Sequence, residues 1–125
     1  MRASALILVT LTLFSAAIAC ADTPAAINKL IADIDAAAKT NKARLLKIMV
    51  INTDVAASTL EGEKARTGLS FGEVYVAHSL AMASHKTFRQ IVAAKTGGQS
   101  WAAIAAANKV SLKGSTAALK EMLKE

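Results

Sequence analysis

Apolar residues recur at helical spacing along most of the chain after its first 21 residues. One helix face is formed by four residues at i, i+3, i+4 and i+7: Ile27, Leu30, Ile31 and Ile34. Residues 45–51 are apolar nearly all round, which predicts a helix at the centre of the fold. No segment combines sustained alternation of apolar and polar residues with turn pairs, so a sheet is not expected.

Turn and capping residues divide this pattern into separate helices. Pro24 predicts the first turn of a helix, and residues 40–41 either interrupt that helix or cap the next one. Asp54 is expected to cap a further helix, which Gly68 would end in the left-handed conformation.

Three later helix starts carry the clearest local signals. Ser70 to Glu73 and Thr87 to Gln90 have the spacing of capping boxes, in which each side chain bonds a free N–H of the other residue. Gly97-Gly98 breaks the chain before a cap at Ser100, and Ser111 or Ser115 would cap a last helix. The predicted fold is an all-α bundle of five or six short helices, forming a single domain over residues 22–125.

The first 21 residues, Met1 to Ala21, have the organisation of a cleaved export signal. Arg2 precedes an apolar run at 5–14, which is too short to span a bilayer, and small residues follow at 15–21. Cleavage after Ala21 would remove the only cysteine, whereas cleavage after Ala19 would place Cys20 first, where bacterial lipoproteins carry lipid.

The preferred prediction is a free periplasmic or secreted protein. A lipoprotein signal resembles Leu-Ala-Gly/Ala-Cys, and here Ala17 stands in place of the leucine. Lipid anchoring at Cys20 to a bacterial membrane is therefore the alternative. Either way, the chain cannot form an internal disulfide, so its stability is expected to come from helix packing.

The chain is basic, with 15 Lys and Arg against 9 Asp and Glu. Such a charge favours anionic partners, although it is also typical of ordinary soluble domains. Residues 87–112 resemble a helix-turn-helix DNA reader, with the recognition helix following Ser111 and Asn108 nearby. An exported protein does not meet the chromosome, so no nucleic-acid partner is expected.

Two stretches share the order turn, cap, aromatic residue and β-branched residue. They are residues 67–74 and 96–104, which indicate either a duplicated hairpin or two similarly capped helices that enter one core. In both cases the aromatic residue is expected to pack inward.

Two longer motifs suggest a family. They are Thr67-Gly68-Leu69-Ser70-Phe71-Gly72-Glu73-Val74-Tyr75-Val76-Ala77-His78-Ser79-Leu80-Ala81 and Ser100-Trp101-Ala102-Ala103-Ile104-Ala105. With these motifs, residues 45–112 resemble a family of small exported bacterial proteins of uncharacterised function. The resemblance implies a fold and a location but no activity, and it brings no site residues.

Catalytic and metal-binding patterns are weak. His78 and His85 are seven residues apart, whereas two metal ligands on a helix are usually three or four apart and need a third ligand. Ser79 beside His78 does not form a nucleophile and base, because neighbours on a helix point about 100° apart. The sequence therefore predicts no enzyme, no metal and no cofactor.

Two functions remain open on the sequence. The first is a binding or structural module of the cell envelope, whose partner would be an envelope protein, peptidoglycan or lipid. Its candidate contact residues are Tyr75, Phe88 and Trp101, for which core packing is the competing role. The second is peripheral binding to anionic membranes through Lys42, Arg44 and Lys47 beside the apolar residues 45–51, for which a buried helix is the competing interpretation.

Overall fold

The computed structural model describes residues 23–112, 119 and 121–124 of the chain. The described residues contain no strand and six named helices: α2 (Pro24–Thr40), α3 (Lys42–Thr53), α4 (Ala57–Thr67), α5 (Phe71–Ser84), α6 (Phe88–Thr96) and α7 (Trp101–Ala107). The prediction of an all-α bundle is confirmed.

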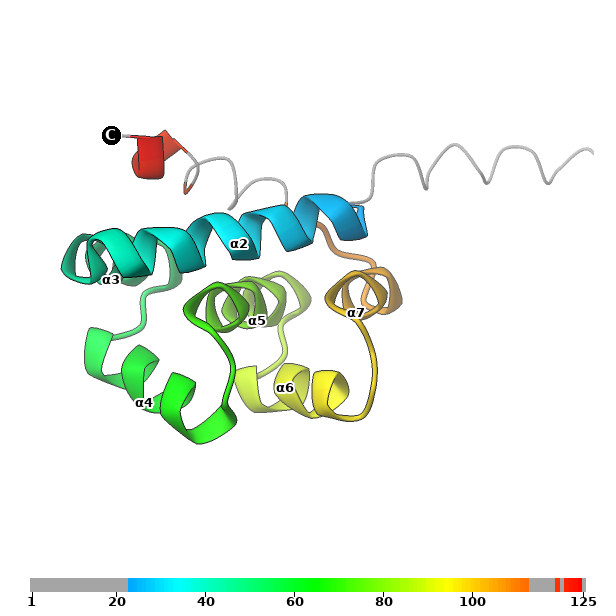
Figure 1. Cartoon of the computed structure of the whole chain (residues 1–125). Coiled ribbons are helices and arrows are strands. Elements are labelled where there is room, and N and C mark those ends of the chain that lie inside the picture. The colour runs from blue at the N-terminus through cyan, green and yellow to red at the C-terminus, as the bar shows by residue number, and fades with distance from the viewer. Residues whose placement is uncertain (1–22, 113–118, 120, 125) are drawn as a thin grey trace, which may run out of the picture.

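Helix α5 is the centre of the bundle and packs against α2, α3, α4, α6 and α7. Figure 1 shows α2 across one side of α5, with α4 and α6 on the opposite side. Every residue from 74 to 81 is buried, so α5 presents no face to water over two turns. A helix surrounded in this way needs no polar face.

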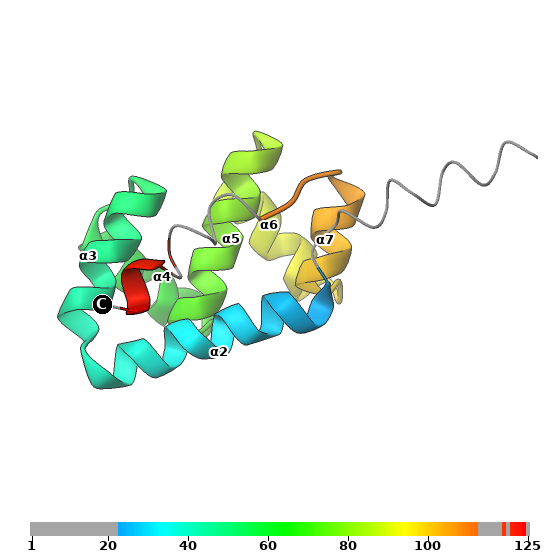
Figure 2. The same ribbon diagram turned by 90° about the horizontal axis from the view of Figure 1, so that it is seen from above.

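The prediction that residues 45–51 form the central helix is wrong. Four apolar residues of this segment are buried in the core: Leu45, Leu46, Ile48 and Met49. Ile51, however, is 69% exposed, because α3 lies at one end of the bundle and only part of its circumference meets other helices (Figure 2).

Helices α2 and α5 cross at Gly72, where their backbones come very close. A Cβ atom placed on Gly72 would lie 2.5 Å from the Ile31 carbonyl oxygen and 2.8 Å from the Ile31 Cα. The Gly72 N–H, one of the free donors at the start of α5, donates to Asp35 Oδ1 of α2 over 2.8 Å. A carboxylate at this end of α5 also interacts favourably with the helix dipole.

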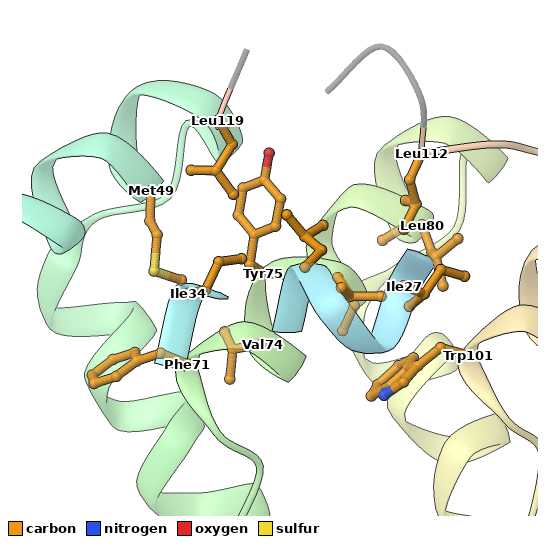
Figure 3. Close-up of a cluster of buried hydrophobic side chains, with 14 of the residues drawn as sticks. Ile27, Ile34, Met49, Phe71, Val74, Tyr75, Leu80, Trp101, Leu112 and Leu119 are labelled. Carbon is orange, nitrogen blue, oxygen red and sulfur yellow. The ribbon is translucent and has the colours of Figure 1, made fainter. Parts of the chain in front are cut away.

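Two described residues that follow α7, Leu112 and Leu119, belong to the hydrophobic core. Leu112 and Leu119 are almost fully buried, and Figure 3 shows the Tyr75 ring pointing toward Leu119. The Arg44 guanidinium donates to the Met122 carbonyl oxygen over 2.6 Å, so the end of the chain is held against α3. The start of the predicted last helix, including Ser115, lies outside the described residues.

Most predicted helix ends are confirmed. Both capping boxes are complete, Ser100 caps α7, and Gly68 ends α4 with a φ of 77°. The prediction that Asp54 caps α4 is wrong. Asp54 instead ends α3 in the left-handed conformation with a φ of 59°, and the cap position of α4 is Ala56, which forms no side-chain cap bond.

The hairpins α4–α5 and α6–α7 share one packing arrangement at their second helix. Phe71 and Trp101 are both buried at the first position of their helices. The prediction that these aromatic residues pack inward is therefore confirmed. A lysine from the preceding helix lies over each ring. Lys64 Nζ is 5.3 Å from the centroid of the Phe71 ring, and Lys95 Nζ is 5.2 Å from that of Trp101.

Gly72→Ala tests the close crossing, and Gly62→Ala on α4 is its matched control. We expect Gly72→Ala to lower the free energy of unfolding by about 1–3 kcal/mol, because the new methyl overlaps the α2 backbone. A Cβ on Gly62 meets only Arg66 Nη1 at 3.7 Å, so Gly62→Ala should raise the same free energy by roughly 0.5–1 kcal/mol. Urea unfolding followed by circular dichroism measures both. A Gly72→Ala variant as stable as the wild type would contradict the crossing.

Candidate functional site

A buried acid–base pair joins α4 to α5. Glu63 Oε1 lies 2.6 Å from His78 Nε2, and the two side chains are 9% and 10% exposed respectively. The His78 ring is stacked on the ring of Phe88, the first residue of α6, with centroids 4.3 Å apart and planes inclined by 19°. The Glu63, His78 and Phe88 cluster therefore fixes three helices relative to one another.

Two contacts within the bundle engage the His78 imidazole. Nε2 of His78 is bonded to Glu63, and one face of the imidazole is covered by Phe88. The arrangement is that of a buried polar contact which holds helices together, in which each group satisfies the other.

Sequence reasoning missed Glu63 as the partner of His78. The signal was local, because Leu60, Glu63 and Thr67 follow the i, i+3, i+7 spacing of a single helix face. Leu60 is fully buried, so a carboxylate on the same face points inward and needs a partner. The identity of that partner depends on how α4 packs on α5.

Beside this cluster lies a groove of about 560 Å³ between the end of α4 and the length of α6. Its lining residues are Arg66, Thr67, Phe88, Arg89, Val92, Ala93, Thr96 and Gly97. The four residues at 89, 92, 93 and 96 follow the i, i+3, i+4, i+7 spacing of one helix face, so the groove runs along α6. Phe88 belongs both to the groove and to the stack on His78.

The net charge of the chain comes from one long interval of the sequence, which includes α6 and α7. No Asp or Glu occurs between Glu73 and Glu121, whereas that interval holds six Lys and Arg. The rest of the chain has equal numbers of cations and anions, so the interval accounts for the whole net charge of +6. The sequence does not contain a run of consecutive basic residues here. It contains a long stretch without acidic residues, and the sequence analysis did not identify that stretch.

The arginines of the groove have no carboxylate partner among the described residues. The ion pairs there are Lys29–Asp33, Lys42–Glu61, His78–Glu63 and Lys124–Glu121. Arg66 and Arg89 take part in none of them. A guanidinium carries five N–H donors and stays charged at any ordinary pH. These two side chains can therefore bind an external anion.

The candidate contact residues are not gathered in one place. Tyr75 is fully buried and Trp101 is 4% exposed, and Trp101 Nε1 donates to Glu73 Oε2 over 3.3 Å. Burial raises the pKa of the Tyr75 phenol, and the neighbouring Ser79 hydroxyl opposes part of that rise. Only Phe88, which is half-buried, reaches the groove.

The basic residues proposed for membrane contact are largely engaged within the bundle. Lys42 Nζ lies 2.7 Å from Glu61 Oε2, Arg44 bonds the Met122 carbonyl, and Lys47 is exposed. No helix among the described residues is both long enough and apolar enough to cross a membrane. Cys20, the proposed lipidation site, lies outside the described residues.

The remaining sequence motifs form no further site in the described part of the chain. His85 is an exposed left-handed residue at the end of α5, away from the buried pair. No group of three His, Cys, Asp or Glu residues among those described could hold a metal ion. The Asn108 amide donates to the Ile104 carbonyl over 2.8 Å, and residues 113–118, where the DNA-recognition helix would begin, are not described.

Comparison of the chain with protein-family models, curated proteins and solved structures finds no match. The resemblance to a family of small exported proteins therefore stays a prediction, and the function is argued from the site itself.

Paired substitutions test the buried contact between α4 and α5. Glu63→Met and His78→Leu should each lower the free energy of unfolding by about 1–3 kcal/mol, because each leaves the other polar group buried without a partner. The double variant should lose less than the sum, since both polar groups are then gone. Urea unfolding of the four proteins measures this coupling, and strictly additive losses would contradict a direct contact.

Proposed function

We propose that this chain is an exported, non-catalytic binding module of the cell envelope that engages anionic partners. Its binding face is the basic half of the bundle, defined as α6, α7 and their flanking turns over residues 86–109. The observation that carries the proposal is a pair of arginines without carboxylate partners among the described residues, Arg89 of this half and Arg66 at the facing end of α4. No Asp or Glu occurs between Glu73 and Glu121, the interval that contains Arg89 and the other three basic residues of this half.

Export is supported by the arrangement of Arg2, the apolar run and the small residues in the first 21 positions. The structure adds a compatible boundary, because α2 begins at Pro24 with Thr23 as its cap. Cleavage after Ala19 or after Ala21 would therefore leave the whole helical bundle in the mature protein.

A binding role without catalysis is supported by the contacts of the acid–base pair and by the lining of the groove. Glu63 and His78 contact each other. The groove itself is lined by cationic, hydroxyl and apolar side chains, with no Cys, His or carboxylate. Groups of this kind bind and orient a ligand. They do not provide a nucleophile with an adjacent base.

The basic half is a better candidate for anionic partners than residues 42–51. In that segment Lys42 is neutralised by Glu61 and the apolar residues are used in the core. A membrane-binding helix needs its apolar face free to enter the interface. Of the large apolar residues in α3, only Ile51 is largely exposed.

A charge-matched pair of variants tests the binding face. We expect the Lys86→Gln, Arg89→Gln, Lys109→Gln variant to elute from a heparin column at clearly lower salt than the wild type. Its control, Lys29→Gln, Lys39→Gln, Lys47→Gln, removes the same charge elsewhere and should elute close to the wild type. All six side chains are exposed, so folding should be preserved. Equal shifts for the two variants would mean that net charge alone governs binding, which would contradict the proposal.

The intact mass of the protein recovered from expressing bacteria tests export and the state of Cys20. We expect a chain that begins at Asp22 and carries no lipid. A mass that includes residues 1–21 would contradict export. A mass that begins at a lipid-modified Cys20 would overturn the free form in favour of a membrane-anchored one.

A further inference from the structure

We infer that the groove between α4 and α6 binds a single-chain amphiphile with an anionic head, either a carboxylate or a phosphate monoester. This inference rests on the proposed function and names the ligand class for its site. The groove has the length of a helix, two arginines without carboxylate partners among the described residues, and apolar side chains along its floor.

The groove follows the length of a single helix. Its lining on that helix runs from Phe88 to Gly97, the first residue of α6 and its C-terminal cap. A helix of nine residues is about 14 Å long at the usual rise per residue. Such a site suits an extended chain, and a volume of about 560 Å³ falls within the range of small-molecule sites.

The guanidinium groups are the charged donors that the groove offers to the head of the ligand. The Thr67 hydroxyl already donates to the Glu63 carbonyl over 2.7 Å and accepts from the Leu69 N–H over 3.2 Å. Arg66 and Arg89 have no carboxylate partner in the described structure. A guanidinium binds a carboxylate or a phosphate with two parallel hydrogen bonds, which gives both affinity and orientation.

The floor of the groove favours an apolar body behind that head. Phe88 and Val92 are half-buried, so part of each side chain faces the groove, and Ala93 is exposed beside them. Covering these groups with an alkyl chain removes apolar surface from water. The stack on His78 holds Phe88 in place before any ligand arrives, which lowers the ordering cost of binding.

An acidic peptide fits this groove less well than an alkyl chain. Each residue of a peptide brings an N–H and a C=O that need partners. The α6 wall is a helix whose internal backbone groups are already bonded to one another, so it presents no free strand edge. An alkyl chain brings no backbone groups, and its only polar part is the head that the arginines can bind.

Isothermal titration of the purified full-length mature protein with dodecanoate and with dodecyl phosphate, each below its micelle concentration, tests the inference. We expect one ligand per chain for at least one of the two heads. Arg66→Gln, Arg89→Gln should weaken that binding by about tenfold or more, because charge-assisted hydrogen bonds are lost. The matched control, Lys39→Gln, Lys47→Gln, removes equal charge from exposed positions outside the binding face and should change affinity less than about threefold.

Control ligands separate the contribution of the anionic head to binding from that of the alkyl chain. Acetate and inorganic phosphate lack the alkyl chain, and dodecyl maltoside lacks the charge, so each should bind much more weakly than the amphiphiles. Binding of phosphate as tight as that of dodecyl phosphate would overturn the inference. Circular dichroism of each variant before titration shows that its helical fold is retained.

The outcomes also separate this inference from the function on which it rests. If neither amphiphile binds while heparin retention still depends on the basic half, the ligand class is wrong and the proposed function stands. If heparin retention does not depend on the basic half either, both the ligand class and the proposed function are wrong. If phosphatidylglycerol vesicles bind through Arg66 and Arg89 while the monomeric amphiphiles do not, the partner is a membrane surface and the inference is overturned.

Discussion

The close crossing of α2 and α5 at Gly72 is the constraint on which the rest of the bundle depends. The Ile31 backbone occupies the space that any larger side chain at this position would need. Asp35 of α2 accepts a hydrogen bond from the N–H of Gly72, so the start of α5 is bonded to the helix that crosses it. With α2 this close on one side, the other helices can pack around the remaining faces of α5, which leaves residues 74–81 buried on every side.

Burial of α5 on all faces has a direct consequence for the candidate site. A histidine at position 78 cannot reach water through its own helix face, so it needs a polar partner inside the protein. Glu63 provides that partner from α4, and Phe88 covers the imidazole from α6. The same Phe88 lines the groove, so the floor of the proposed binding site is set by packing at the centre of the bundle.

The sequence predicted most of what is local and little of what depends on how helices meet. The caps at Ser70, Thr87 and Ser100 were correct because a cap involves residues only a few positions apart. The central helix was misplaced, since apolar content favoured residues 45–51, although residues 74–81 contain no Asp, Glu, Lys or Arg. The partner of His78 and the groove could not be predicted, because they exist only where α4, α5 and α6 come together. The run without acidic residues can be read from the sequence, and it contains Arg89 of the groove.

The most direct test is to map the residues of the folded protein that respond to a ligand. A heteronuclear NMR titration of isotope-labelled protein with dodecanoate or dodecyl phosphate reports on every backbone amide at once. The account predicts that shift changes concentrate on residues 66–67 and 88–97, with little change in α2 and α3. Changes confined to residues 42–51, with the α6 amides unaffected, would contradict the claim that the groove is the binding site.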